Sequence, residues 1–104
     1  MAIVVTVGRN VGDSLDARPM STGEWERFRG EVLAAVEEHV GRPYFTGVGV
    51  GESPEWGTED AYTVVAEAPQ YSDIREKLHA RLAEVGRYYG QEAVAVTEGR
   101  TTFV

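Results

Sequence analysis

Gly47, Gly49 and Gly51 alternate along this 104-residue sequence and are its first candidates for a binding site. A glycine-rich loop binds phosphate when it leads into the N-terminus of a helix, whose free N–H groups hold the anion. Here the run GVGVG is followed by ESPEWGTED and then by a second β-like segment, without the Lys-Ser/Thr of a phosphate loop. The context therefore argues against a phosphate or dinucleotide site.

The same glycines fit one face of a β-strand over residues 44–50, because alternate side chains of a strand point to opposite faces. Val48 and Val50 would then lie on the other face. Glycines within a strand indicate a bulge or the close approach of something bulky. Three interpretations stay open: an aromatic side chain of the same chain, Trp56 for preference, folds back over the bare face, a partner segment or ligand binds there in a shallow groove, or the glycines only curve the strand.

Acidic and aromatic residues follow the glycines in the segment 52–60. Glu59 and Asp60 would flank Trp56 if they belong to a loop, and would point to opposite faces if they already belong to a strand. No apolar pocket that would raise a carboxyl pKa for acid catalysis is evident around them. The residues that we expect to contact a partner are Gly47, Gly49, Gly51, Glu55, Trp56, Glu59 and Asp60.

His39 and His79 are the other candidates for chemistry. No helix or strand spacing brings them together, and isolated histidines serve structure more often than catalysis or metal binding. The absence of cysteine excludes disulfides, thiolate metal sites and a cysteine nucleophile. A Ser-His-Asp arrangement assembled in space stays open, although no nucleophile elbow supports it. We predict no catalytic residue, no metal, no cofactor and no affinity for nucleotides.

Composition and charge limit the class of protein. Hydrophobic residues make up 42% of the chain and charged residues 26%, which is typical of one globular domain over residues 1–104. The net charge of −7 argues against DNA, RNA and anionic membranes as direct ligands. The acidity provides solubility or mimics nucleic acid. The first ten residues lack a basic segment and a long apolar run, so we expect no signal peptide or membrane span and a cytoplasmic location.

Local signals predict the start and end of a first helix. Ser21, three residues before Glu24, forms a capping box in which the serine hydroxyl accepts the Glu24 N–H and the Glu24 carboxylate accepts the Ser21 N–H. Met20 and Trp25 take the two positions of a hydrophobic staple. Apolar residues then recur every three or four positions until Gly41 ends the helix.

A second helix shows the same pattern, with Ser72 or Asp73 as its N-cap and Gly90 at its end. Its apolar face is formed by Ile74, Leu78, Leu82, Val85 and Tyr89.

Strands are predicted at 2–8, 44–50 and 61–67, with a loop of about ten residues between the last two. The final segment EAVAVTEGRTTFV predicts a strand, a turn at Glu98-Gly99 and a short last strand.

The resulting order predicts an α+β protein with the ferredoxin-like βαββαβ pattern: an antiparallel sheet with two helices on one face, plus a short C-terminal strand. The usual 4-1-3-2 strand order would put the glycine-bearing strand at an edge. The uncovered face of the sheet would then carry small or weakly polar residues such as Thr6, Thr63 and Thr97.

Part of this pattern resembles small proteins from actinobacteria and their phages. The resemblance rests on a first strand ending in Gly8, on MSTGEWERF opening a helix, and on a glycine-bearing strand followed by a tryptophan loop; it covers most of residues 1–67. That family has no assigned reaction, so the resemblance implies a phage context and no catalytic residues. In that context it implies a small acidic domain that binds and modulates a host or defence protein in the host cytoplasm.

The sequence as a whole predicts a non-enzymatic protein-interaction module that uses the segment 52–60, the glycine face and the uncovered face of the sheet. The alternative is a small-molecule-binding protein or enzyme of the dimeric ferredoxin-like barrel type, with a cleft on the uncovered sheet face. Because one sheet face lacks a cover, we also expect a homodimer formed through that face or through the edge strands.

Overall fold

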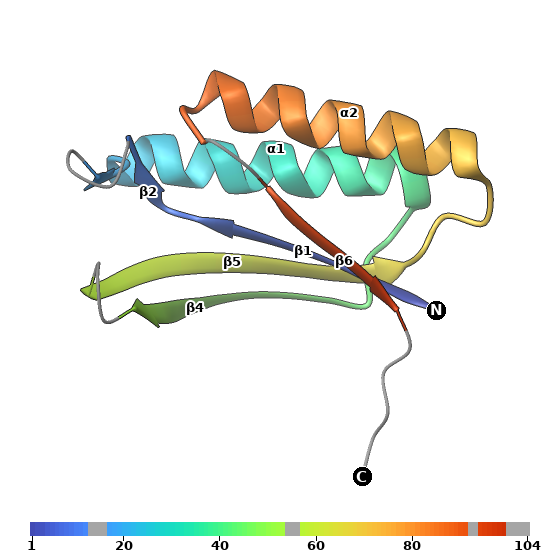
Figure 1. Ribbon diagram of the computed structural model, residues 1–104, viewed down its shortest axis with the longest axis horizontal. Helices are drawn as coiled ribbons and strands as arrows, with labels where there is room; N and C mark the ends of the chain where they lie inside the picture. The colour runs from blue at the N-terminus through green and yellow to red at the C-terminus, as the bar shows by residue number, and fades with distance from the viewer. Residues whose placement is uncertain (13–16, 54–56, 92–93, 100–104) are drawn as a thin grey trace, which may run out of the picture.

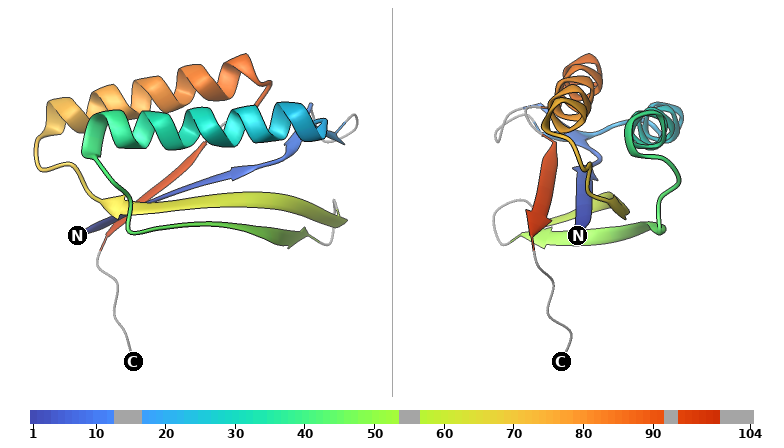
Figure 2. Two further views of the ribbon diagram at one scale, coloured as in Figure 1. Left: turned by 180° about the vertical axis from the view of Figure 1, so that it is seen from behind. Right: turned by 90° about the vertical axis from the view of Figure 1, so that its right-hand side faces the viewer.

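The computed structural model describes residues 1–12, 17–53, 57–91 and 94–99 (Figure 1). Its main body is a four-stranded antiparallel sheet with two helices on one face (Figures 1 and 2). The strands are β1 (Ala2–Gly8), β4 (Phe45–Ser53), β5 (Gly57–Glu67) and β6 (Ala95–Gly99), and the helices are α1 (Thr22–Val40) and α2 (Ser72–Tyr88). The sheet order β4-β5-β1-β6 confirms the predicted ferredoxin-like arrangement, with the glycine-bearing strand at an edge.

The core lies between the helices and the inner face of the sheet. In β1, Ile3, Val5 and Val7 are buried while the residues between them are only half-buried, so the alternation of the strand places one face against the helices. The other elements contribute the buried residues Tyr62, Val64 and Ala66 of β5, Trp25, Phe28, Val32, Ala35 and Val36 of α1, and Leu78, Leu82 and Val85 of α2.

Helix α1 begins and ends where the local signals predict. Ser21 Oγ accepts the Glu24 N–H at 3.2 Å, which confirms the cap, while the Glu24 carboxylate accepts the Ser21 hydroxyl at 3.1 Å instead of the Ser21 N–H. Met20 and Trp25 are both buried, as a staple requires. Gly41 ends the helix with a φ of +95°, and its N–H donates to the carbonyl four residues earlier at 3.0 Å.

Helix α2 begins one residue before the start that Ser72 as N-cap would give, and two residues before the start that Asp73 would give. Tyr71 is the N-cap, with an extended backbone and no side-chain capping bond, so Ser72 and Asp73 are already helical and the prediction of either as N-cap is wrong. Gly90, with a φ of +80°, closes the helix as predicted, and the Gln91 N–H donates to a carbonyl of the last turn at 2.8 Å. Within the described ranges, no helix has both the length and the apolar character needed to cross a bilayer.

Strands β4 and β5 form a longer and tighter hairpin than the sequence predicts. They pair along all nine residues of β4 and as far as Gly57, so the ten-residue loop expected between 44–50 and 61–67 is wrong. Propensity underestimates these strands because cross-strand pairing stabilises glycine and acidic residues that disfavour isolated strands. Glu55 and Trp56 lie outside the described residues.

Strand β6 corrects a second prediction. Glu98 and Gly99 pair with the first residues of β1 and belong to the sheet, so no turn forms at Glu98-Gly99. The Glu98 carboxylate also lies 2.9 Å from Arg75 Nε of α2, an ion pair that links the strand to the helix above it. These nonlocal contacts outweigh the local turn preference of a Glu-Gly pair. The predicted C-terminal strand falls in residues 100–104, outside the described residues.

Two short strands, β2 (Asn10–Val11) and β3 (Arg18–Pro19), form a separate two-stranded ribbon in a region predicted as a loop. The ribbon returns the chain from the end of β1 to the start of α1 (Figure 1).

Candidate functional site

The face of the sheet opposite the helices, called the open face below, has small side chains at its centre, with larger ones such as Phe45 and Glu59 around them. Thr97 lies on it opposite Val4, so all three predicted threonines share this face. Two rows cross three strands: Thr6, Thr63 and Gly47 in one, and Gly8, Ala61 and Gly49 in the next. Because these residues present little bulk, a ligand or a partner can approach the backbone closely here.

An aromatic ring covers part of the glycine face, as one interpretation of the sequence required, but the ring is that of Phe45. A Cβ added to Gly47 would lie 2.7 Å from Phe45 Cζ, so a larger residue there would force the exposed Phe45 ring to move aside. Around Gly49 the same added atom would meet nothing within 4 Å. The expected cover, Trp56, is outside the described residues, and the bare area around Gly49 is open in the described part of the chain.

Glu59 lies on the open face and crosses over Gly8 of the neighbouring strand. Its Oε1 accepts the Asn10 N–H at 2.8 Å. A Cβ on Gly8 would overlap the carboxylate, since Glu59 Cδ would lie only 2.7 Å away. Glu59 aligns with Gly51 of β4, and the next residue, Asp60, points to the opposite face, which confirms the strand alternative for this acidic pair.

Asp60 is held by Arg9, the first residue after β1. Arg9 Nη1 donates to Asp60 Oδ2 at 2.9 Å, and Arg9 Nε donates to the Met20 carbonyl at 2.8 Å. The Arg9 N–H donates to the Asp60 carbonyl at 2.9 Å. Arg9 therefore joins the end of β1 to β5 and to the residue that precedes the cap of α1.

Gln91, which follows α2, fixes the same end of β1 from the other side. Its Nε2 donates to the carbonyls of Gly8 at 3.0 Å and Asn10 at 2.8 Å. The end of β1 thus has its backbone bound by one carboxylate and one amide from distant parts of the chain. Sequence analysis missed Arg9, Asn10 and Gln91; the only available signal was the polar pair Arg9-Asn10 directly after a buried strand.

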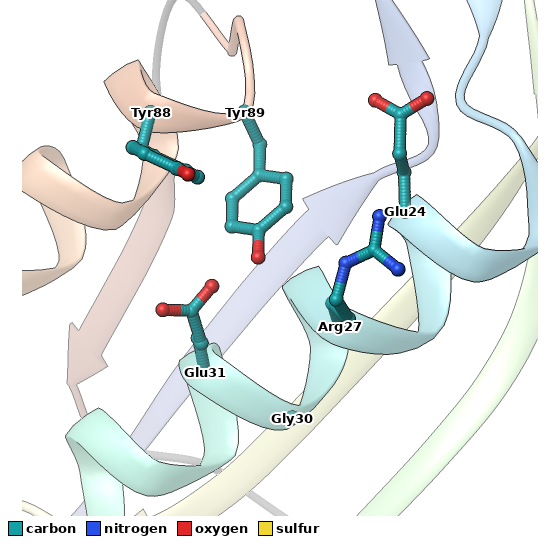
Figure 3. Close-up of a pocket in the computed structure, with 6 residues that line it drawn as sticks. All are labelled: Glu24, Arg27, Gly30, Glu31, Tyr88 and Tyr89. Carbon is teal, nitrogen blue, oxygen red and sulfur yellow. The ribbon is translucent and has the colours of Figure 1, made fainter.

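A concave region lies between α1 and the end of α2 (Figure 3). It is a groove of about 650 Å³ lined by Glu24, Arg27, Gly30, Glu31, Tyr88 and Tyr89. The Tyr89 hydroxyl points toward Glu31 (Figure 3), and its hydrogen bond to that carboxylate, with burial and charge repulsion as smaller causes, raises the Tyr89 pKa above 10.0. Arg27 stands between the two glutamates along α1, so the charged groups of the groove partly neutralise one another.

The two histidines are separate, as predicted. His39 Nδ1 lies 2.7 Å from the Ala35 carbonyl in its own helix, and His79 lines a different groove beside α2. Among the residues that the structure describes, no three His, Asp or Glu side chains gather closely enough to hold a metal ion.

On the open face, the Glu59 carboxylate lies beside the glycine and threonine rows. It offers one negative charge beside a flat area of exposed backbone, an arrangement suited to a flat ligand that carries a positive charge. The structure describes five of the predicted site residues. Four of them lie together on this face: Gly47, Gly49, Gly51 and Glu59. The fifth, Asp60, lies on the opposite face.

Comparisons with known proteins identify the fold. No protein-family model and no curated protein sequence matches the chain. Among solved structures, a phage SAM lyase in its apo state superposes with a TM-score of 0.58 and 23% identity, over 91% of this chain and 75% of that one. The likeness shows that the two proteins share a fold.

Proposed function

We propose that the chain binds S-adenosylmethionine (SAM) on its open face and cleaves it as a lyase. The observation that carries the proposal is the shared fold with a phage SAM lyase over 91% of this chain. Of the two functions considered from the sequence, this corresponds to the small-molecule enzyme on the open sheet face, and it replaces the non-enzymatic interaction module as the preferred function.

The charge of the chain supports a cationic substrate. SAM has a positively charged sulfur and an ammonium group. A protein with a net charge of −7 attracts such a ligand electrostatically within the Debye length of the solution. The same charge repels nucleotides that carry several phosphates. The adenine ring is flat and fits against the small residues around Gly49.

The chemistry assigns Glu59 to binding. In a lyase reaction one carbon–sulfur bond breaks and its electron pair goes to the positive sulfur, which gives a neutral thioether. The carboxylate oxygen of the carbon fragment bonds to the carbon that has lost the sulfur, so the fragment closes into a ring without adding water. A carboxylate beside the sulfur would stabilise the charged substrate more than the transition state, in which that charge disappears. Glu59 therefore pairs with the ammonium group, whose charge is unchanged by the reaction, and the protein orients the reacting atoms.

The test is the loss of SAM and the appearance of its thioether fragment, measured by liquid chromatography and mass spectrometry. Glu59→Gln keeps an oxygen that accepts the Asn10 N–H but removes the charge, so the fold should be preserved. We expect KM to rise at least about 10-fold, because the lost hydrogen bond between the carboxylate and the ammonium group contributes that much to affinity. Glu38→Gln makes the same change at an exposed position of α1 and is expected to leave KM within about twofold.

Three results would contradict the proposal. Unchanged SAM after prolonged incubation with high concentrations of the protein would exclude the reaction. Products that contain added water at the earliest times would indicate a hydrolase. Equal KM values for Glu59→Gln and Glu38→Gln would remove the open face near Glu59 as the binding site.

A further inference from the structure

Exposed apolar side chains are concentrated on strand β4 at one edge of the sheet. Tyr44, directly before the strand, and Phe45, Val48 and Val50 within it are between 58% and 66% exposed. β4 is the strand farthest from the two helices, and its outer side has no neighbour in the described sheet (Figures 1 and 2). Strand edges of this kind carry backbone N–H and C=O groups that are free to pair with another strand.

The edge lacks the features that normally prevent such pairing. Proteins protect edge strands with charged residues, proline or short length. From Phe45 to Gly51 the sequence FTGVGVG contains neither a charge nor a proline, and the strand is nine residues long. The opposite edge, β6, is five residues long and carries Glu98. Residues 45–51 of β4 thus form an uncharged strip on a chain of net charge −7, with Glu52 as the first charged residue of the strand, and two acidic copies meet less repulsion there than at a charged edge.

We propose that two copies of this chain pair through antiparallel β4 strands about a two-fold axis at Val48, which joins the two four-stranded sheets into one. In this register Val48 faces its own counterpart, Val50 faces the partner's Thr46, and Phe45 faces the partner's Gly51. The first two contacts lie on the helix side and the third on the open face, because the open-face residues of β4 are Phe45 and the alternating glycines.

The register is complementary in shape on both faces. β-Branched residues directly opposite each other stabilise antiparallel pairs, and here Val meets Val and Val meets Thr. On the open face each Phe45, whose ring lies over Gly47 of its own strand, faces Gly51 of the other copy, and this glycine leaves room for the aromatic side chain. Two-fold pairing uses the same strip on both copies, so a single uncharged strand suffices.

The first test is the molar mass of the protein without any ligand, measured by light scattering during size-exclusion chromatography. We expect about twice the 11.4 kDa mass of one chain at micromolar concentrations. Val48→Lys places two like charges at the centre of the interface and is expected to raise the dimer dissociation constant at least about 100-fold. Tyr71→Lys makes the same kind of change at the similarly exposed N-cap of α2, and we expect it to remain dimeric.

The second test uses the absence of cysteine from the chain. A single Val48→Cys faces itself across the axis, within the Cα separation that a disulfide spans, so mild oxidation should give a covalent dimer. A single Val50→Cys lies about 14 Å from its counterpart, four residues along the strand, and should stay unlinked.

These measurements separate the dimer from the proposed reaction, because neither needs SAM. A mass of 11.4 kDa at all concentrations up to the millimolar range would overturn the proposal and leave the strand to a different partner. A mass of three chains, or a dimer that persists in Val48→Lys, would also overturn it, since another surface would then join the copies. Efficient cross-linking through Val50→Cys would show that the register is wrong.

Discussion

Gly8→Ala tests whether position 8 must be glycine because the Glu59 carboxylate occupies the space that a Cβ would take. The new Cβ would overlap the Glu59 carboxylate, and because the overlapping atoms are the end of a flexible side chain, Glu59 can swing away. In doing so it loses its 2.8 Å bond to the Asn10 N–H. Such a bond to a charged group is worth about 1.5–3 kcal/mol, and the lower value suits a half-buried carboxylate.

A second effect has the opposite sign. Alanine is favoured over glycine within a strand by about 0.5–1 kcal/mol, and Gly8 has no positive φ that would disfavour alanine. The net expectation is that Gly8→Ala lowers the free energy of unfolding by about 1 kcal/mol. In a Glu59→Ala background the overlap is absent, so the same substitution should raise it by about 0.5 kcal/mol.

Urea denaturation of the four proteins measures this change of sign. With a denaturant dependence of about 1 kcal/mol per molar, Gly8→Ala should lower the midpoint by about 1 M in the parent and raise it by about 0.5 M in the Glu59→Ala background. The coupling free energy would be about 1.5 kcal/mol. Equal shifts in the two backgrounds would refute the contact between Gly8 and Glu59 as the reason for the glycine.

Three further predictions concern caps and ionisable groups. Ser21→Ala should lower the free energy of unfolding by about 1 kcal/mol by leaving a helix N–H without its acceptor, and identical denaturation midpoints would remove the cap. In an absorbance titration, Tyr89 should ionise above pH 10, and Glu31→Gln should lower its pKa; an unchanged titration would exclude the hydrogen bond. The hydrogen bond from the Tyr44 hydroxyl lowers the pKa of Glu67 below 4.5, and the N-terminal ammonium contributes less to the same shift. This carboxylate therefore stabilises the fold above pH 4.5 and loses its effect as pH falls through the lowered pKa, so the stability difference between the parent and Glu67→Gln should vanish in acid; a difference independent of pH would contradict the pairing.

Local interactions explain which parts of the fold can be predicted from the sequence. A cap such as Ser21 binds an N–H three residues away, and Gly41 and Gly90 end helices through their own backbone angles, so the signal and its effect lie within one short segment. The alternation of β1 likewise follows from neighbouring residues. Because these elements occur in the order βαββαβ, the strand order and the edge position of the glycine strand followed from the sequence as well.

The length of the hairpin and the end of β6 did not follow, because both depend on pairing between distant residues. Glu59, Glu98 and Gly99 disfavour strands by their own preferences, yet each is aligned with a neighbouring strand. The sequence thus determined the elements, their order and the bare glycine face. Only the tertiary structure decided that Glu59 crosses over Gly8 and accepts the Asn10 N–H, because these contacts join residues far apart in the sequence and form only after the strands have taken their register.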